Sequence, residues 1–170
     1  KDGFVNTKVM SDNMLHKMFW RGLNDPSIYY HGDFYMGIPS VTLRLGIYRL
    51  ADQLVREGNI PMAKRVLAHL EQVMPDKVIP YDQFSASMVG LYLSAGDEKK
   101  ALEMANVMVR RNSKALDYYL SGGIRSNERN IQIALYEMNL IISSFKESGV
   151  APAKYKELEE MFTAQMSKVQ

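Results

Sequence analysis

Apolar residues recur at helical spacing through most of the chain. Within residues 40–58 they fall at i, i+4, i+7, i+8 and i+11, which places them on one face of a helix. These positions are Leu43, Ile47, Leu50, Ala51 and Leu54. We expect Ser40 to cap the start of this helix and Gly58 to end it in a left-handed turn.

A second helix is predicted to follow at once. Pro61 suits its first turn, because the missing N–H would be unpaired there in any case, and Pro75 stops it. Its apolar face consists of Ala63, Val66, Leu67, Leu70 and Met74. The same arrangement is then expected again, with Asp82 and Asp97 as caps and Gly96 as the turn. The apolar positions of this second pair are Phe84, Met88, Leu91, Tyr92, Ala95, Ala101, Ala105 and Met108.

The two predicted helix pairs match each other when Gly58 is placed on Gly96, a shift of 96 − 58 = 38 residues. Under this shift Ala63 meets Ala101, a small residue five positions after each glycine. Two helices joined by such a turn resemble the tetratricopeptide repeat, whose period is ~34 residues. The additional residues fit the connector at 76–81. We therefore predict an all-α fold of antiparallel helix pairs, stacked as a short, right-handed, tetratricopeptide-like array.

The rest of the chain is predicted to complete a single helical-repeat domain over residues 1–170. A third helix pair is expected to be a degenerate repeat, because Lys154 stands where the small residue is needed. Repeat arrays need atypical units at their ends, so this pair is predicted to cap the array. Its stripe consists of Ile131, Leu135, Met138, Ile142 and Phe145, and Gly149 ends it. The predicted divisions are 1–39 (N-terminal cap and lead-in), 40–75 (repeat 1), 82–112 (repeat 2), 113–125 (an insert broken at Gly122–Gly123) and 126–170 (capping repeat).

Composition limits the classes of function. The 170 residues carry a formal net charge of +2 and contain no Cys. The basic residues are interspersed with acids, so no nucleic-acid surface is predicted. Without Cys the chain has no disulfide framework, thiolate metal ligand or thiol nucleophile. No run approaches the ~20 apolar residues of a membrane-spanning helix. Since the chain begins at Lys1, we expect it to be a soluble, excised or processed part of a longer protein.

Catalytic patterns are not found in the sequence. There is no G-x-S-x-G motif, and the three histidines, at 16, 31 and 69, show no metal-binding spacing. The turn SGGIR, residues 121–125, is predicted to connect two helices, with anion binding as the alternative. The twelve Met residues lie mostly on the helical stripes and are predicted to pack in the core. We therefore predict no catalytic residue, no metal and no cofactor.

A binding groove is predicted on the inner surface of the first helix of each pair. Tyr48, Asp52 and Arg56 are four residues apart and share one helix face, and Gln83 is the corresponding candidate in the second pair. Asp52 and Arg56 can also pair with each other as a solvated i, i+4 ion pair. The two interpretations, a solvated ion pair and a groove that contacts a peptide, remain alternatives at this point.

The N-terminal stretch 11–30 is predicted to begin with a short helix. Ser11 or Asp12 is the expected cap, Gly22 the expected end, and three methionines spaced by four residues its buried face, namely Met10, Met14 and Met18. A turn at Asn24-Asp25-Pro26 should follow, because Asx side chains bond nearby backbone and Pro fixes φ.

Aromatic residues give this stretch a second interpretation. Trp20 is predicted to cover the open end of the first repeat as a lid. Alternatively, the segment stacks on a sugar, since aromatic faces pack on apolar sugar faces. The candidate site residues are Trp20, Arg21, Asn24, Asp25, Tyr29 and Tyr30, with Phe34 and Tyr35 close by in the sequence.

Several segments together resemble one protein family. They are FWRGLNDPSIYY (19–30), YRLADQLVREGNIPMAKRVL (48–67), VMPDKVIPYDQF (73–84), YLSAGDEKKALEMA (92–105) and LDYYLS (116–121). They look like the soluble C-terminal region of large bacterial multi-pass membrane proteins that resemble protein O-mannosyltransferases of the glycosyltransferase-C superfamily. In that family the stretch corresponding to 31–40 is rich in acids and Asn, whereas here it reads HGDFYMGIPS.

The resemblance implies an extracytoplasmic, periplasmic helical-repeat domain attached to a glycosyltransferase-like membrane protein, with a cytoplasmic location as the alternative. The catalytic acids of the family lie in its membrane portion, so none is carried over. The predicted function is a non-catalytic accessory domain that binds a protein, a peptide or its own membrane part. The alternative is a sugar-binding domain or a soluble helical enzyme that uses the aromatic residues.

Overall fold

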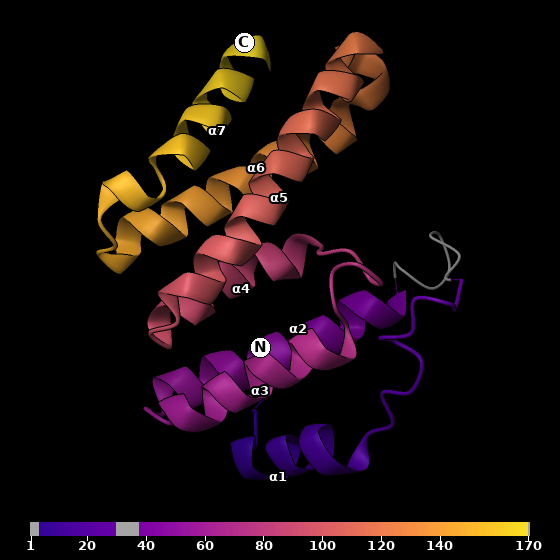
Figure 1. The fold of residues 1–170 in the computed structure, drawn as a ribbon, viewed down its shortest axis with the longest axis vertical. Helices are drawn as coiled ribbons and strands as arrows, with labels where there is room; N and C mark the ends of the chain where they lie inside the picture. Colours follow the sequence, from indigo (N-terminus) through magenta and orange to yellow (C-terminus); the bar gives the residue numbers. More distant parts are fainter. Residues whose placement is uncertain (1–3, 30–37, 170) are drawn as a thin grey trace. The chain divides into compact units, whose positions relative to one another are not determined.

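The computed structural model describes residues 4–29 and 38–169, and every regular element in these ranges is helical (Figure 1). The chain forms two compact units, residues 1–85 and 86–170, where the sequence predicts a single domain. The first unit contains α1 (Thr7–Asp12), the π-helix η1 (Asn13–Lys17), α2 (Ile38–Arg56) and α3 (Ile60–Val73). The boundary falls within α4 (Gln83–Ser94). The second unit contains α5 (Glu98–Ser121), α6 (Ile124–Ser148), the 3-10 turn η3 (Pro152–Lys154) and α7 (Lys156–Val169).

The core of the first unit lies between α2 and α3, which pack against each other. The buried side chains are those of the predicted apolar faces, namely Ile47, Leu50, Ala51, Leu54, Ala63, Val66, Leu67 and Leu70. Gly58 has a φ of 74°, which confirms the left-handed turn. One predicted boundary is wrong: α2 begins at Ile38, so Ser40 lies inside its first turn. Pro39 is compatible with this earlier start because a first-turn residue needs no amide donor.

Arg44 connects α2 to the segment that precedes α4. Its side chain is only 1% exposed, although it carries a charge. The guanidinium donates from Nη2 to the carbonyl oxygen of Ile79 at 2.6 Å, and from Nη1 to that of Pro80 at 2.7 Å and to Asp82 Oδ2 at 3.0 Å. Asp82 in turn caps α4, as predicted, by accepting from the Ser85 amide at 3.1 Å.

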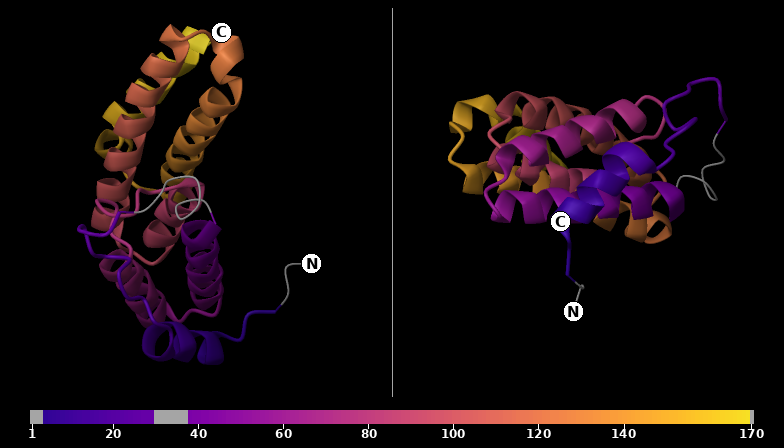
Figure 2. Two further views of the ribbon diagram at one scale, coloured as in Figure 1. Left: turned by 90° about the vertical axis from the view of Figure 1, so that its right-hand side faces the viewer. Right: turned by 90° about the horizontal axis from the view of Figure 1, so that it is seen from below.

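In the second unit α5 and α6 pack along each other, and α7 packs on both (Figure 2, left). Asp97 caps α5 by accepting from the Lys100 amide at 3.2 Å, as predicted. The predicted stripe of α6 is largely buried, and Phe145 stacks on Tyr155 with ring centroids 5.2 Å apart. Residues 113–121, which the sequence marks as an insert, continue α5, and the break comes at Gly122–Gly123.

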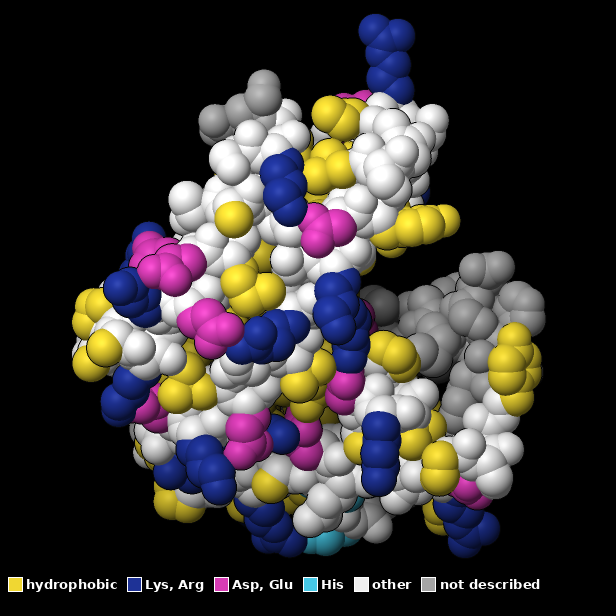
Figure 3. Space-filling model, turned by 45° about the horizontal axis from the view of Figure 1, so that its top comes forward, with side chains coloured by type: hydrophobic (Ala, Val, Ile, Leu, Met, Phe, Trp, Pro, Cys, Tyr) yellow, Lys and Arg dark blue, Asp and Glu magenta, His cyan; other side chains and the backbone are white. Residues whose placement is uncertain are grey.

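Charges of both signs are interspersed over the face drawn in Figure 3. Several form ion pairs between helices of the second unit, for example Arg110 with Glu157 and Lys168 with Asp117. Hydrogen bonds from Lys168 and Gln165 lower the pKa of Asp117. Among the residues that the structure describes, no helix is long and apolar enough to cross a membrane.

Candidate functional site

The predicted groove residues of α2 line a surface hollow of about 530 Å³. The i, i+4 spacing brings Tyr48, Asp52 and Arg56 to the same face of the helix. The remaining lining residues are Val5, Leu45, Arg49 and Gln53, which the sequence analysis did not include. The Arg56 Nε lies 2.9 Å from Asp52 Oδ2, so the predicted ion pair is present, and both of its residues line the hollow. Gln83 is exposed at the start of α4 and does not line the hollow.

A second hollow of about 220 Å³ adjoins the first, and the two share Val5 and Arg49. Its other lining residues are Phe4, Asn6, Val9, Met10 and Asn13. Phe4 is 89% exposed and Val9 is 53% exposed. The lining of the two hollows thus combines apolar side chains with charged and amide groups, which suits the binding of a polypeptide segment.

The short N-terminal helix contributes Val9 and Met10 to the second hollow and packs against α2. Thr7 Oγ1 donates to Glu57 Oε2 at 2.9 Å, and Glu57 Oε1 accepts from Gln53 Nε2 at 3.0 Å. The helix begins earlier than predicted, because Asn6 is the cap and accepts from the Val9 amide. The predicted caps are therefore wrong: Ser11 is buried inside α1, and Asp12 pairs with Lys17 and His16.

The predicted inward face of three methionines is only partly correct. Met14 is buried, Met10 is half-buried, and Met18 is 38% exposed. Met18 follows the end of η1 in an extended conformation (φ −73°, ψ 140°), which takes it off the helical register. Gly22, the predicted helix end, instead lies in the turn that follows, with a φ of 85°.

Trp20 fastens the segment after η1 onto the first helix pair. Its Nε1 donates to the carbonyl oxygen of Met14 at 2.8 Å, and its ring meets the ring of His69 edge to face at 5.6 Å. Further along, Asn24 Nδ2 donates to the carbonyl oxygen of Gln72 on α3 at 3.3 Å. The indole N–H of Trp20 and the amide nitrogen of Asn24 therefore both donate to main-chain carbonyl oxygens of the same unit.

The predicted Asx turn is present, because Asp25 Oδ1 accepts from the amide and the hydroxyl of Ser27 at 2.9 and 2.7 Å. These hydrogen bonds lower the pKa of Asp25. Arg21 lies over the ring of Phe19 at 5.6 Å, and Tyr29 is 83% exposed. Of the remaining aromatic candidates, Tyr30, Phe34 and Tyr35 lie outside the described residues.

Two histidines that are far apart in the sequence, His16 and His69, lie near Arg65, and no sequence pattern predicts this. His16 Nδ1 lies 3.2 Å from Asp12 Oδ1, and His16 Nε2 lies 3.0 Å from Arg65 Nη2. Burial lowers the pKa of His69, and the charges of His16 and Arg65 lower it further. Within the described ranges, no group of His, Asp and Glu side chains is placed to hold a metal ion.

Comparison of the chain with known protein families, curated proteins and solved structures returns no match. The resemblance to O-mannosyltransferase-like proteins thus rests on the quoted segments alone. What the geometry offers is ionic, amide and apolar contact surface along α2. The described residues that line the two hollows include no Ser, Cys or His side chain.

Proposed function

We propose that this chain is a non-catalytic interaction domain that binds a segment of a partner protein along α2. The observation that carries the proposal is the hollow of about 530 Å³ in which Tyr48, Asp52 and Arg56 come together. Tyr and Arg are the side chains most enriched at the centres of protein interfaces. Because the ion pair of Asp52 with Arg56 lies in the lining of this hollow, the ion pair and a peptide-binding groove are compatible with each other.

We further propose that the helix pairs are tetratricopeptide-like repeats. The two turns related by the shift of 38 residues have the same backbone hydrogen bonds. Asn59 N donates to Leu54 O, and Asp97 N donates to Tyr92 O, each at 2.8 Å. Gly58 and Gly96 have φ values of 74° and 73°, and each is followed by a residue whose side chain caps the next helix. This local equivalence supports a common repeat unit.

A pull-down from bacterial envelope extract tests the groove. We expect the double substitution Tyr48→Ala with Arg56→Ala to abolish capture of partners that the unmodified chain retains. The matched control is Tyr29→Ala with Lys64→Ala, which removes an exposed Tyr and an exposed cation of the same unit outside the hollow. Equal capture by all three proteins would remove the α2 groove from the proposal. Loss in the control alone would favour the aromatic segment and its sugar-binding alternative.

We propose, finally, that the partner belongs to the envelope because this domain accompanies a glycosyltransferase-like membrane protein on its periplasmic side. The quoted sequence segments support this placement. Reading the gene upstream of Lys1 tests it, because several membrane-spanning helices in the same reading frame are expected. A gene that begins at or just before Lys1, with no such helices, would contradict it.

A further inference from the structure

The exposed large apolar side chains of the second unit are concentrated on α5 and α6. Among its described residues, those that stay exposed are Val107, Tyr118, Ile124, Ile133 and Tyr136. Tyr118 is 74% exposed and Tyr136 is 60% exposed. Large aromatic groups left in water at such levels are typical of an interaction surface when they lie close together.

Helical spacing gathers these side chains into two stripes. On α5 the positions of one face are Val107, Arg111, Lys114 and Tyr118, at i, i+4, i+7 and i+11. On α6 the corresponding positions are Arg125, Arg129, Ile133 and Tyr136, at i, i+4, i+8 and i+11. Each stripe therefore carries two basic and two apolar residues. We call the two stripes together the α5–α6 face.

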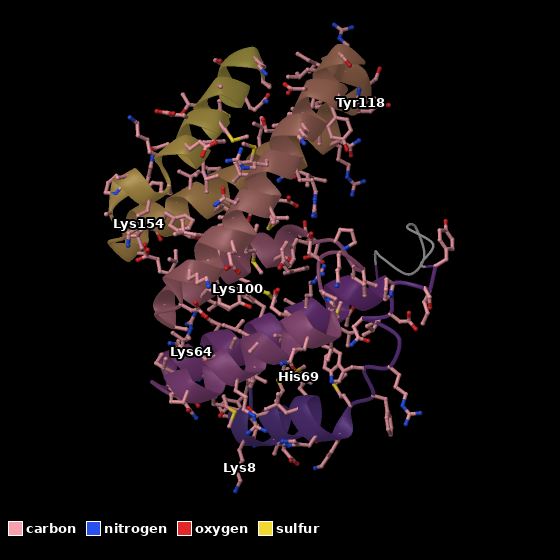
Figure 4. The ribbon with its side chains drawn as sticks, viewed as in Figure 1. Lys8, Lys64, His69, Lys100, Tyr118 and Lys154 are labelled. Atoms are coloured by element: carbon pink, nitrogen blue, oxygen red, sulfur yellow. The ribbon has the colours of Figure 1, made fainter. Side chains whose placement is uncertain are left out.

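The α5–α6 face is not the face that α7 covers. The residues of α5 that contact α7 are others, namely Arg110, Ser113 and Asp117, which bond to Glu157, Gln165 and Lys168. Figure 2 (left) shows α5 and α6 side by side with α7 behind them. In Figure 4 the side chain of Tyr118 points away from α7. Within the second unit, one side of the helix pair is thus packed and this face remains exposed.

Each stripe of the α5–α6 face carries two formal positive charges, and the acids near them in the sequence are Asp117, Glu128 and Glu137. Asp117 accepts from Lys168 and Gln165, and Glu137 is buried and accepts from Asn112 Nδ2 at 2.8 Å. Glu128 accepts from Gln132 on its own helix. The stripes themselves contain no acidic position.

We propose that the α5–α6 face docks an acidic amphipathic helix of a partner protein. The exposed Ile and Val side chains match the apolar stripe of such a helix, and its Asp and Glu side chains complement the Lys and Arg residues. Val107 and Tyr118 are eleven residues apart, which corresponds to about 16 Å along a helix and so to a partner helix of about three turns. Val107 and Ile133, unlike the two Tyr rings, do not stack on bases, and the presence of one aliphatic side chain in each stripe favours a polypeptide over a nucleic acid.

Fluorescence anisotropy with a designed probe tests the proposal. The probe is a fluorescein-labelled 15-residue peptide with Leu on one helical stripe and Glu at most other positions. It is compared with a scrambled peptide of the same composition and with a version in which Lys replaces Glu. We expect the acidic amphipathic peptide alone to bind, and its affinity to fall as salt is raised.

Two variants of the full chain then locate the site. Arg125→Glu with Arg129→Glu reverses the charge of one stripe, and Tyr118→Ala with Tyr136→Ala removes the exposed rings. Each is expected to weaken binding of the probe by about tenfold or more. The matched control is Lys8→Glu with Lys64→Glu, which makes the same change in net charge at exposed residues of the first unit (Figure 4). Its affinity for the probe should stay within about twofold of the unmodified chain.

Several results would overturn the proposal. Equal binding of the scrambled peptide would reduce the effect to net charge, as would an equal loss in the Lys8/Lys64 control. Tighter binding of oligo-dT or of phosphatidylglycerol vesicles than of the peptide would assign the face to nucleic acid or to a membrane surface. Self-association that disappears in the Tyr118/Tyr136 variant would assign it to a second copy of this chain. The groove variant at Tyr48 and Arg56 should bind the probe normally, which separates this site from the α2 groove.

Discussion

At the scale of single residues, Arg44 stands out because its charged side chain is almost completely buried. A buried guanidinium is stable only when its donors are satisfied, and here two carbonyl oxygens and one carboxylate oxygen accept from it. We expect Arg44→Met to lower the free energy of unfolding by about 3 kcal/mol, since one buried and two part-buried acceptors lose their partner. Urea unfolding followed by circular dichroism measures this. Arg56→Met on the exposed face of the same helix is the control, and equal small effects at both positions would contradict the prediction.

Arg44 also shows what the sequence could not reveal at this scale. Its partners Ile79, Pro80 and Asp82 lie 35–38 residues further along the chain, and two of them contribute main-chain oxygens, which carry no sequence signal. The sequence therefore predicts neither the burial of Arg44 nor its hydrogen bonds. By contrast, the ion pair of Asp52 with Arg56 is local, and its i, i+4 spacing is enough to predict it.

Trp20 gives a second prediction at this scale. Its ring packs on His69, and its indole N–H is bonded to the Met14 carbonyl. We expect Trp20→Ala to lower the melting temperature by about 5 °C, because a partly buried large side chain and a hydrogen bond are lost together. Differential scanning calorimetry checks this. A variant of unchanged melting temperature that loses affinity for oligosaccharides would instead assign Trp20 to a ligand site.

At the scale of elements, the α2–α3 turn depends on the positive φ of Gly58. A Cβ at Gly58 would meet no other atom within 4 Å, so the cost of a side chain there is the backbone conformation alone. We expect Gly58→Ala to destabilise the chain by about 1 kcal/mol. Gly58→Asn should cost less, because Asn tolerates the left-handed region better. Thermal unfolding of both variants tests this, and equal losses would point to a cause other than backbone strain.

The attachment of the N-terminal segment to α3 is expected to weaken in acid. Burial, His16 and Arg65 lower the pKa of His69 below its usual value of 6.5. As the pH falls below 6.5, His69 is protonated in the unfolded chain before it is protonated in the folded chain. The folded state therefore loses stability as the pH falls from 6.5 to the lower pKa of His69 in the folded state. Above pH 6.5 the ring is neutral in both states and contributes no such dependence.

Trp20 fluorescence reports this change, because the indole ring lies against His69. We expect its emission maximum to shift to the red between pH 7.5 and pH 5, as the ring becomes exposed to water. His69→Phe keeps a ring beside Trp20 but cannot titrate, so its spectrum should change less over the same range. A red shift of the same size in both proteins would rule out His69 as the cause.

Elements bounded by local signals were predicted well from the sequence. The α2–α3 turn has a glycine, a capping Asn59 and an early Pro61, all within four residues of one another. The N-terminal helix lacks such a boundary. Asn6 caps it before the apolar pattern begins, and η1 has π-helical rather than α-helical geometry. The predicted start of this helix is therefore wrong, and its predicted inward face is only partly correct. Residues 113–121 are predicted as part of an insert because they follow the last residue at which the two repeats match. No local sequence signal interrupts α5 before Gly122, so the structure continues the helix through them.

At the scale of the whole molecule, the chain forms two compact units, and this division predicts that a substitution in one unit has little effect on the stability of the other. The unfolding of a helical array is cooperative only when neighbouring units stabilise each other strongly. We expect Arg44→Met to speed hydrogen exchange at the amides of α2 and α3 and to leave the amides of α5, α6 and α7 within about threefold of their original rates. Gly149→Ala places a residue with a side chain at a backbone φ of 77° after α6. We expect it to speed hydrogen exchange in α5, α6 and α7 and to leave α2 and α3 nearly unchanged. Mass-spectrometric exchange on both variants decides the matter, because a single cooperative domain would lose protection throughout in each case.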